Sequence, residues 1–132
     1  MLFITQLTNF DLDLNTLIFV NFNMVFEVFE KRFVLGPNEK DFLITTANFD
    51  VSKKIIVAFS IVQMDGDNEI IKYDTAHGKV HVHKYYVKEN IVSILFNEEI
   101  DTSTFARLRS DVLNNWQEYK KLYLKKERFN NM

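Results

Sequence analysis

The clearest pattern along the chain is an alternation of apolar and polar positions between residues 16 and 35. From residue 25, alternate residues fall on opposite sides, as in a β-strand: Val25, Glu27, Phe29, Lys31 and Phe33 on one, and Phe26, Val28, Glu30, Arg32 and Val34 on the other. Asn21 and Asn23 favour a break, so we expect two strands in this stretch.

Short apolar runs separated by turn residues continue to residue 97. The runs span residues 42–46, 54–64, 69–75, 79–87 and 91–96, and the turns fall at 36–39, 48–52, 65–68, 76–78 and 88–90. The run at 54–64 is almost continuously apolar, which is typical of a central strand covered on both faces. Short strands joined by short turns predict an antiparallel meander.

The spacing of apolar residues changes at residue 102, from which they recur every three or four positions. They are Phe105, Leu108, Val112, Trp116, Tyr119 and Tyr123, and the opposite side carries Arg107, Ser110, Asn114, Lys121 and Lys125. This spacing predicts one amphipathic helix over about residues 102–128, with Asp101, Thr102 or Ser103 as its N-cap. We therefore expect a single α+β domain over residues 1–132, in which about five to seven strands pack against the long C-terminal helix.

Composition and the absence of common motifs exclude several classes of function. The chain has 132 residues and no Cys, which excludes disulfides, a thiol nucleophile and a zinc–thiolate site. No apolar run approaches the ~20 residues of a membrane span, and the N-terminus lacks the basic region of a signal peptide. The sequence carries no P-loop, Gly-rich dinucleotide turn or HExxH motif. We expect a cytoplasmic protein without a membrane association and outside the common nucleotide-dependent classes.

Charge is distributed unevenly along the chain. The net charge is −2, but residues 102–132 carry seven Lys or Arg against three Asp or Glu. One interpretation is favourable positive charge at a helix C-terminus. The other is a surface for nucleic acid or an acidic partner, for which the candidates are Lys120, Lys121 and Lys125 of the helix and Lys79.

The candidate chemistry is concentrated in residues 73–86, because all three histidines of the chain lie between positions 77 and 83. Strand alternation separates His81 and His83 from Val80 and Val82. If residues 75–78 connect a hairpin, the expected pairs are Asp74 with Lys79, Lys72 with His81 and Ile70 with His83. The polar patch would then comprise Lys72, Asp74, Lys79, His81, His83 and Tyr85, and a one-residue bulge at Gly78 would remove Asp74 from it.

Three interpretations of this patch remain open. His81 and His83 are suited to general acid–base catalysis, with Lys72 or Lys79 near a developing negative charge and His77 and Asp74 in support. A metal-independent ribonuclease needs such a set. Alternatively His77, His81 and His83 ligate a divalent transition metal such as Zn. The third interpretation is the solvated face of a hairpin without chemistry.

A resemblance adds to this picture. Residues 72–83 read KYDTAHGKVHVH, and residues 114–119 read NNWQEY. Together they resemble a group of small uncharacterised prokaryotic proteins with a Tyr-Asp-x-Ala-His-Gly-x-x-His-x-His hairpin and a helix containing Asn-Trp-x-x-Tyr. More distantly the order is similar to TumE-type toxins of toxin–antitoxin pairs, whose motif would match Tyr73, Asp74, Gly78, His81 and His83.

The resemblance implies a small cytoplasmic toxin that acts on RNA. We therefore expect a toxin-like, metal-independent ribonuclease without a cofactor, whose partners are RNA and an antitoxin protein. The alternatives are a non-catalytic interaction module, as a homodimer built on a sheet edge or in an antitoxin complex, and a histidine metal-binding protein.

Overall fold

The computed structural model describes residues 17–21, 24–89 and 91–131. The N-terminal residues 1–16 and Asn23 of the expected break lie outside these residues. The elements in chain order are β1 (Leu17–Asn21), β2 (Met24–Val34), β3 (Asp41–Asp50), β4 (Ile55–Asp65), β5 (Asn68–Asp74), the short 3₁₀ helix η1 (Ala76–Gly78), β6 (His81–Lys84), β7 (Ile91–Ile94) and α1 (Thr102–Asn130).

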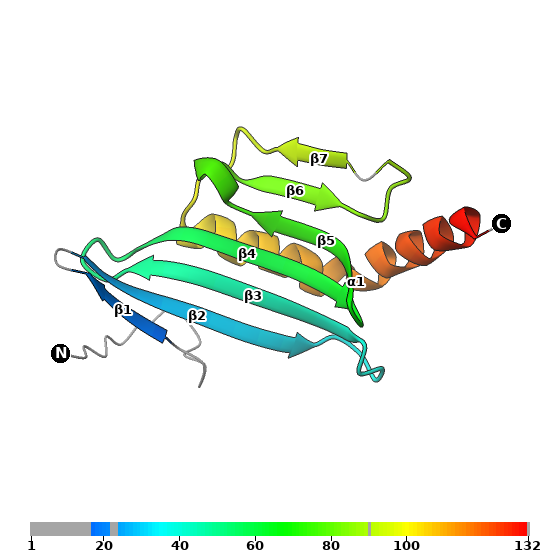
Figure 1. The fold of residues 1–132 in the computed structure, drawn as a ribbon, viewed down its shortest axis with the longest axis horizontal. Coiled ribbons are helices and arrows are strands. Elements are labelled where there is room, and N and C mark those ends of the chain that lie inside the picture. Colours follow the sequence, from blue (N-terminus) through cyan, green and yellow to red (C-terminus); the bar gives the residue numbers. More distant parts are fainter. Residues whose placement is uncertain (1–16, 22–23, 90, 132) are drawn as a thin grey trace.

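The strands form one antiparallel sheet in the order β1-β2-β3-β4-β5-β6-β7, so every strand pairs with its neighbour in sequence. Figure 1 shows the sheet with α1 behind it, and α1 contacts β3, β4 and β5. The predicted α+β meander with a long C-terminal helix is confirmed. Within the described part of the chain, no helix combines the length and the apolar character that crossing a membrane requires.

The helix buries the stripe that the sequence predicts. Phe105, Leu108, Val112 and Tyr123 are buried, and Trp116 and Tyr119 pack partly buried against the same core. The five residues expected on the opposite side are all exposed. Asp101 is the N-cap, since its carboxylate accepts a hydrogen bond of 2.7 Å from the Thr104 backbone N–H.

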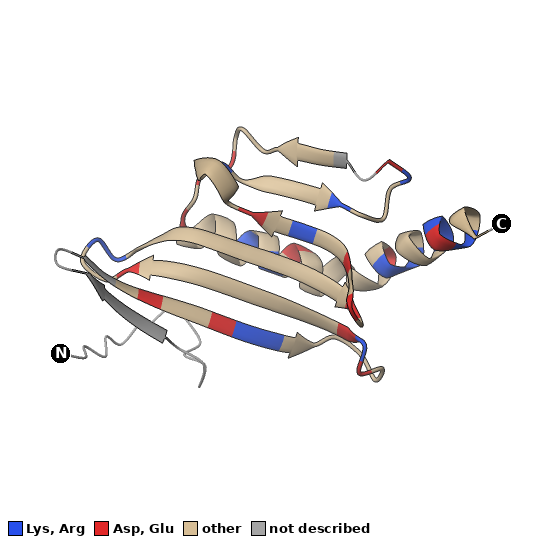
Figure 2. Ribbon diagram, in the orientation of Figure 1, with Lys and Arg blue, Asp and Glu red and all other residues tan. Residues whose placement is uncertain are grey.

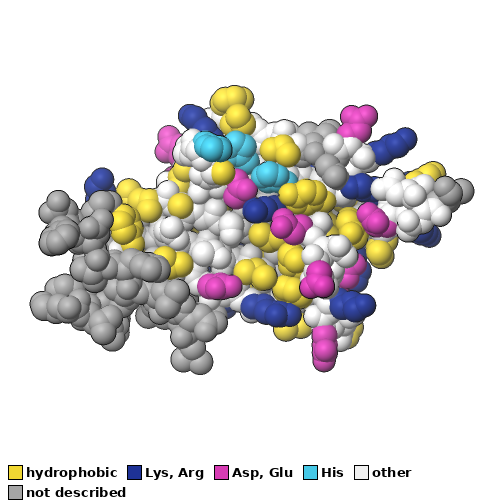
Figure 3. Space-filling model, viewed as in Figure 1, with side chains coloured by type: hydrophobic (Ala, Val, Ile, Leu, Met, Phe, Trp, Pro, Cys, Tyr) yellow, Lys and Arg dark blue, Asp and Glu magenta, His cyan; other side chains and the backbone are white. Residues whose placement is uncertain are grey.

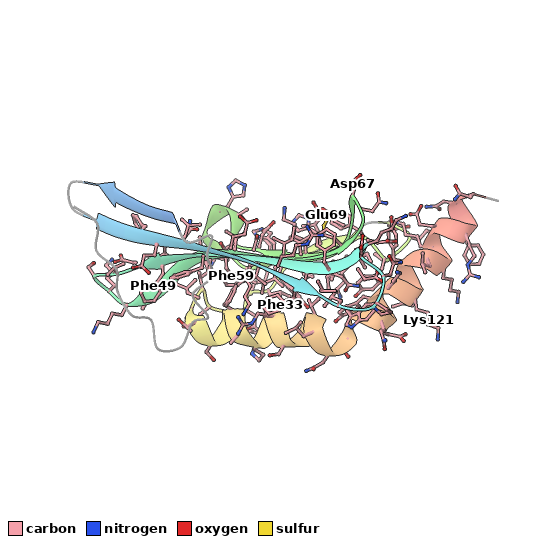
Figure 4. The ribbon with its side chains drawn as sticks, turned by 90° about the horizontal axis from the view of Figure 1, so that it is seen from below. Phe33, Phe49, Phe59, Asp67, Glu69 and Lys121 are labelled. Carbon is pink, nitrogen blue, oxygen red and sulfur yellow. The ribbon has the colours of Figure 1, made fainter. Side chains whose placement is uncertain are left out.

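The main core cluster lies between the sheet and α1. Leu43, Ile61 and Val112 are completely buried there, and the ring of Phe59 meets that of Phe105 edge to face at 5.5 Å. Figure 4 shows Phe33 and Phe59 between the sheet and the helix. The other face, which α1 does not cover, is called the open face below.

The prediction that the strand at 54–64 is covered on both faces is wrong. Burial in β4 alternates, with Phe59 and Ile61 buried towards the helix and Ser60 and Val62 only partly buried on the open face. A single helix can cover only one face of a sheet, so the apolar residues on the other side of β4 keep some contact with solvent.

The ends of β3 and β6 differ most from the prediction. β3 continues to Asp50 through the expected turn at 48–52, because Asn48 pairs with both Val28 and Ala58 on the open face, where a polar side chain is tolerated. β6 ends at Lys84 instead of residue 87, because the Val87 N–H donates to the Lys84 carbonyl in a turn.

Candidate active site

The hairpin of β5 and β6 brings the candidate residues together on the open face. Its register pairs Asp74 with His81 and Lys72 with His83. The expected pairs of Asp74 with Lys79 and of Lys72 with His81 are therefore wrong by two residues. A shift of two residues keeps every side chain on its predicted face, whereas a shift of one would have reversed it.

The connection between the two strands explains the shift. It spans residues 75–80 and contains η1, where His77 has φ 60° and Gly78 has φ 74°. These two left-handed residues reverse the chain over a longer path than the four-residue turn predicts. Lys79 consequently lies in the connection, exposed and outside the strand pairing, and it is not part of the patch.

The Asp74 carboxylate is the centre of the cluster. Its Oδ2 lies 3.1 Å from Nε2 of His83 and 3.9 Å from Nζ of Lys72, and its Oδ1 lies 3.8 Å from Nδ1 of His81. Oδ1 also accepts a bond of 3.3 Å from the Ala76 N–H, which fixes the start of η1. The side chains of Asp74 and His81 are 16% and 15% exposed, so they are shielded but still accessible to solvent.

The two imidazoles are held through different ring nitrogens. Nδ1 of His81 lies 2.9 Å from the Lys79 carbonyl oxygen, which can only accept a hydrogen bond. A neutral His81 therefore carries its proton on Nδ1 and leaves the Nε2 lone pair available. His83 donates from Nε2 to Asp74, which leaves Nδ1 as the nitrogen without a hydrogen bond among the described residues. Within the described residues, Nε2 of His81 and Nδ1 of His83 thus remain without a hydrogen-bond partner.

Neighbouring groups make the cluster rigid. Thr75 Oγ1 accepts a hydrogen bond of 3.0 Å from the Phe59 N–H and donates to the Phe59 carbonyl oxygen, which ties the end of β5 to β4. Tyr85 stacks on His83 with ring centroids 5.9 Å apart. Figure 3 shows the histidine side chains, in cyan, gathered over η1 and β6 on the open face.

Among the described residues, His77 makes no hydrogen bond or ion pair with Asp74, His81 or His83. It is exposed on η1. Across the described residues, no group of three or more His, Asp or Glu side chains is arranged to hold a metal ion. The ligand set His77, His81 and His83 suggested by the sequence is therefore not formed.

The helix α1, with its basic residues, packs on the side of the sheet opposite to the open face. Figure 2 shows Lys and Arg, in blue, along the second half of the helix. Lys120 is paired with Asp41, with Nζ 2.5 Å from Oδ1, and Lys121 lies beside it in the same shallow groove. Lys125 lines a different groove near the C-terminal end of α1. Lys120 and Lys121 therefore lie in one groove on the helix side, and Lys125 lies in another.

A comparison with known families matches residues 36–129, under the description "Domain of unknown function (DUF7718)". The match covers more than two thirds of the chain. The chain belongs to the DUF7718 family. No curated protein and no solved structure matches it. The DUF7718 match includes β3 to β7 and nearly all of α1, and thus the whole Asp74 cluster, while β1 and β2 precede it.

The DUF7718 domain also contains a second carboxylate cluster that the sequence patterns did not reveal. Oδ2 of Asp111 on α1 accepts hydrogen bonds of 2.9 Å from the Tyr73 hydroxyl and 2.8 Å from the Tyr119 hydroxyl, and Oδ1 accepts one from the Asn115 amide. Burial and the nearby Asp111 carboxylate raise the pKa of Tyr73 and that of Tyr119 well above the ordinary value for tyrosine. This cluster joins the helix to β5.

Proposed function

We propose that this protein is a metal-independent endoribonuclease and the toxin of a toxin–antitoxin pair, with its catalytic site at the Asp74 cluster. The observation that supports this most is the pair of imidazoles held around one carboxylate through different ring nitrogens. A general base and a general acid acting on the same phosphodiester need that kind of asymmetry.

The roles follow from the hydrogen bonds. His81 Nε2 removes the proton from a ribose 2′-hydroxyl, and the resulting 2′-oxygen attacks the adjacent phosphorus. Protonated His83 gives its Nδ1 proton to the departing 5′-oxygen, while its Nε2–H remains bonded to Asp74. Lys72 offsets the negative charge of the phosphorane. The products are a 2′,3′-cyclic phosphate end and a 5′-hydroxyl end.

The shape of the surroundings is consistent with a polymer substrate. The cluster lies on the open face of a sheet, and a strand of RNA can cross such a face without entering an enclosed pocket. Tyr85, stacked on His83, extends the patch with an aromatic ring of the kind on which bases stack.

The test is cleavage of a defined RNA by untagged protein in the presence of a chelator, with the product ends identified by mass spectrometry. We expect 2′,3′-cyclic phosphate ends, and we expect His81→Ala and His83→Ala each to lower kcat/KM by about 10²–10⁴-fold. His77→Ala is the matched control, because it removes an imidazole outside the cluster and should leave the rate unchanged.

Absence of cleavage by the wild-type protein on any RNA tested, or cleavage that persists in the double variant of His81 and His83, would rule out this site. The toxin role has its own test in cells. Induced expression should stop growth, and the His81→Ala variant should not; equal toxicity of the two would contradict the assignment.

A second candidate function, protein binding, is favoured by the exposed edge of the sheet. β7 is the last strand of the sheet, and Val92, Ile94 and Phe96 are 54%, 41% and 77% exposed. An apolar edge strand is a template for a strand from an antitoxin or from a second copy. Light scattering tests the second copy: a wild-type dimer that becomes a monomer in Ile94→Lys supports it, and a monomeric wild type refutes it.

A further inference from the structure

A groove near the C-terminal end of α1 has a chemistry that the proposed catalytic cluster does not use. It has a volume of about 450 Å³ and lies between the last turns of the helix and the connection from β6 to β7. Its lining residues are Tyr86, Lys88, Leu122, Lys125, Lys126, Phe129 and Asn130.

The helix repeat builds one wall of this groove. Leu122, Lys125, Lys126 and Phe129 recur at intervals that place them on one side of α1. The opposite wall is fixed to the helix by two contacts. Tyr86 stacks on Tyr119 with ring centroids 5.2 Å apart, and Lys126 Nζ donates a hydrogen bond of 2.6 Å to the Tyr85 carbonyl. The groove is therefore held open by the fold.

The lining combines apolar rings with positive charge. Phe129 is 64% exposed and Leu122 is 37% exposed, which is unusual for large apolar side chains close together. Among the residues that the structure describes, three lysines line the groove and no carboxylate does. Among the described residues, no hydrogen bond or ion pair engages Lys88 or Lys125. The groove thus suits an occupant that carries both a flat apolar ring and a negative charge.

We propose that this groove binds one nucleotide of a single-stranded RNA, with the base on Phe129 and Tyr86 and the phosphates on Lys88 and Lys125. The inference rests on the proposed function and names a substrate-binding subsite for it. Proteins that bind single strands combine aromatic stacking platforms with cationic grooves in this way. A volume of 450 Å³ is in the range of small-ligand sites and is too small for an amphipathic helix anchored over several turns.

The groove and the catalytic cluster are linked through adjacent residues. Tyr85 stacks on His83 on the open face, and Tyr86 lines the groove on the helix side. A strand that passes over the end of β6 would therefore meet both surfaces. This continuity favours an RNA strand over a free nucleotide as the occupant.

The test is fluorescence anisotropy with a labelled single-stranded RNA octamer in which every 2′-hydroxyl is methylated, so that it cannot be cleaved. We expect the double variant Lys88→Ala/Lys125→Ala to bind about 10-fold or more weakly, with a salt slope reduced by about 1.4 for two lost phosphate contacts. Phe129→Ala should also weaken binding by about 5-fold or more, through lost stacking. The matched control, Lys40→Ala/Lys53→Ala, removes the same charge from exposed turns outside the groove and should not change the affinity.

The outcomes separate this inference from the proposed function. If the wild-type protein cleaves RNA but the groove variants bind the octamer normally, the groove proposal is overturned and the catalytic one stands. If the groove variants lose binding while the wild-type protein cleaves no RNA, the groove proposal stands and the catalytic one is overturned. A nucleoside monophosphate that binds as tightly as the octamer would also overturn the groove proposal, because the strand would then contribute nothing.

Discussion

Two carboxylates organise the two faces of the sheet, and they do so with different partners. Asp111, on α1, receives hydrogen bonds from Tyr73 and Tyr119 on the helix side. Asp74, on the open face, is surrounded by His81, His83 and the more distant Lys72. Tyr73 and Asp74 are adjacent in the sequence, and strand alternation sends their side chains to opposite faces.

The difference between the partners separates structure from chemistry. Phenols near a carboxylate stay protonated across the physiological range, so the Asp111 cluster is a fixed set of hydrogen bonds that holds the helix on the sheet. Imidazole is the side chain that ordinarily changes charge between pH 5 and 8. We infer that one cluster stabilises the fold and that the other exchanges protons.

The largest expected effect on folding comes from Asp111→Ala. This variant leaves the hydroxyls of Tyr73 and Tyr119 without their acceptor, and we expect the free energy of unfolding to fall by about 3 kcal/mol. Urea denaturation measures it. Glu118→Ala, an exposed acid on the same helix, is the control and should cost less than about 0.5 kcal/mol. Similar losses in the two variants would contradict the structural role of the Asp111 cluster.

Asp74→Asn should have the opposite profile, with a large effect on rate and a small one on stability. The amide cannot orient His83 as the carboxylate does, so we expect kcat/KM for RNA cleavage to fall by about 10–100-fold. The free energy of unfolding should change by less than about 1 kcal/mol, since the cluster is partly exposed. An Asp74→Asn variant that is unfolded, or one that keeps full activity, would contradict the distinction between a catalytic Asp74 and a structural Asp111.

Alkaline pH should weaken the Asp111 cluster. The pKa of Tyr73 and that of Tyr119 are raised in the folded protein, so their stabilisation is fully present below about pH 10, the value for unfolded tyrosine. Above that pH the unfolded chain releases protons that the folded chain retains. Stability should therefore fall by at most about 1.4 kcal/mol per pH unit for each tyrosine. Tyr119→Phe should reduce this slope in denaturation measured between pH 9 and 11, and an unchanged slope would argue against the assignment.

The smallest effect is expected from His77→Gly. His77 has φ 60°, a conformation that costs a side chain some energy and that glycine adopts freely. We expect the variant to be about 0.5 kcal/mol more stable, as thermal unfolding would register, with an unaltered rate of RNA cleavage. A loss of RNA cleavage in this variant would show that His77 contributes to the catalytic site.

Sequence patterns predicted the fold because each pattern reports burial on one side of an element. Alternation of Val80 and Val82 with His81 and His83 gave the correct face for the histidines, since the valines belong to the core. The pairing register was not predictable in the same way. It depends on the left-handed backbone of His77 and Gly78, and only Gly78 carries a sequence signal for that conformation.

The contacts between α1 and the strands could not be predicted from sequence patterns. Tyr73 belongs to the hairpin motif, but Asp111 lies 38 residues further along the chain, and no sequence pattern links the two. The groove at the C-terminal end of α1 likewise depends on contacts between residues that are far apart in the sequence. The helix repeat of Leu122, Lys125 and Phe129 can be seen in the sequence, but nothing in it indicates that Tyr86 and Lys88 form the other wall.

The pH dependence of RNA cleavage in the presence of a chelator tests the acid–base assignment most directly. The wild-type profile of kcat/KM should be bell-shaped, because the rate falls at low pH when the base is protonated and at high pH when the acid is deprotonated. His81→Ala should lose the acidic limb and His83→Ala the alkaline limb. A wild-type profile without two limbs, or variants that keep both, would contradict the assignment of these two histidines.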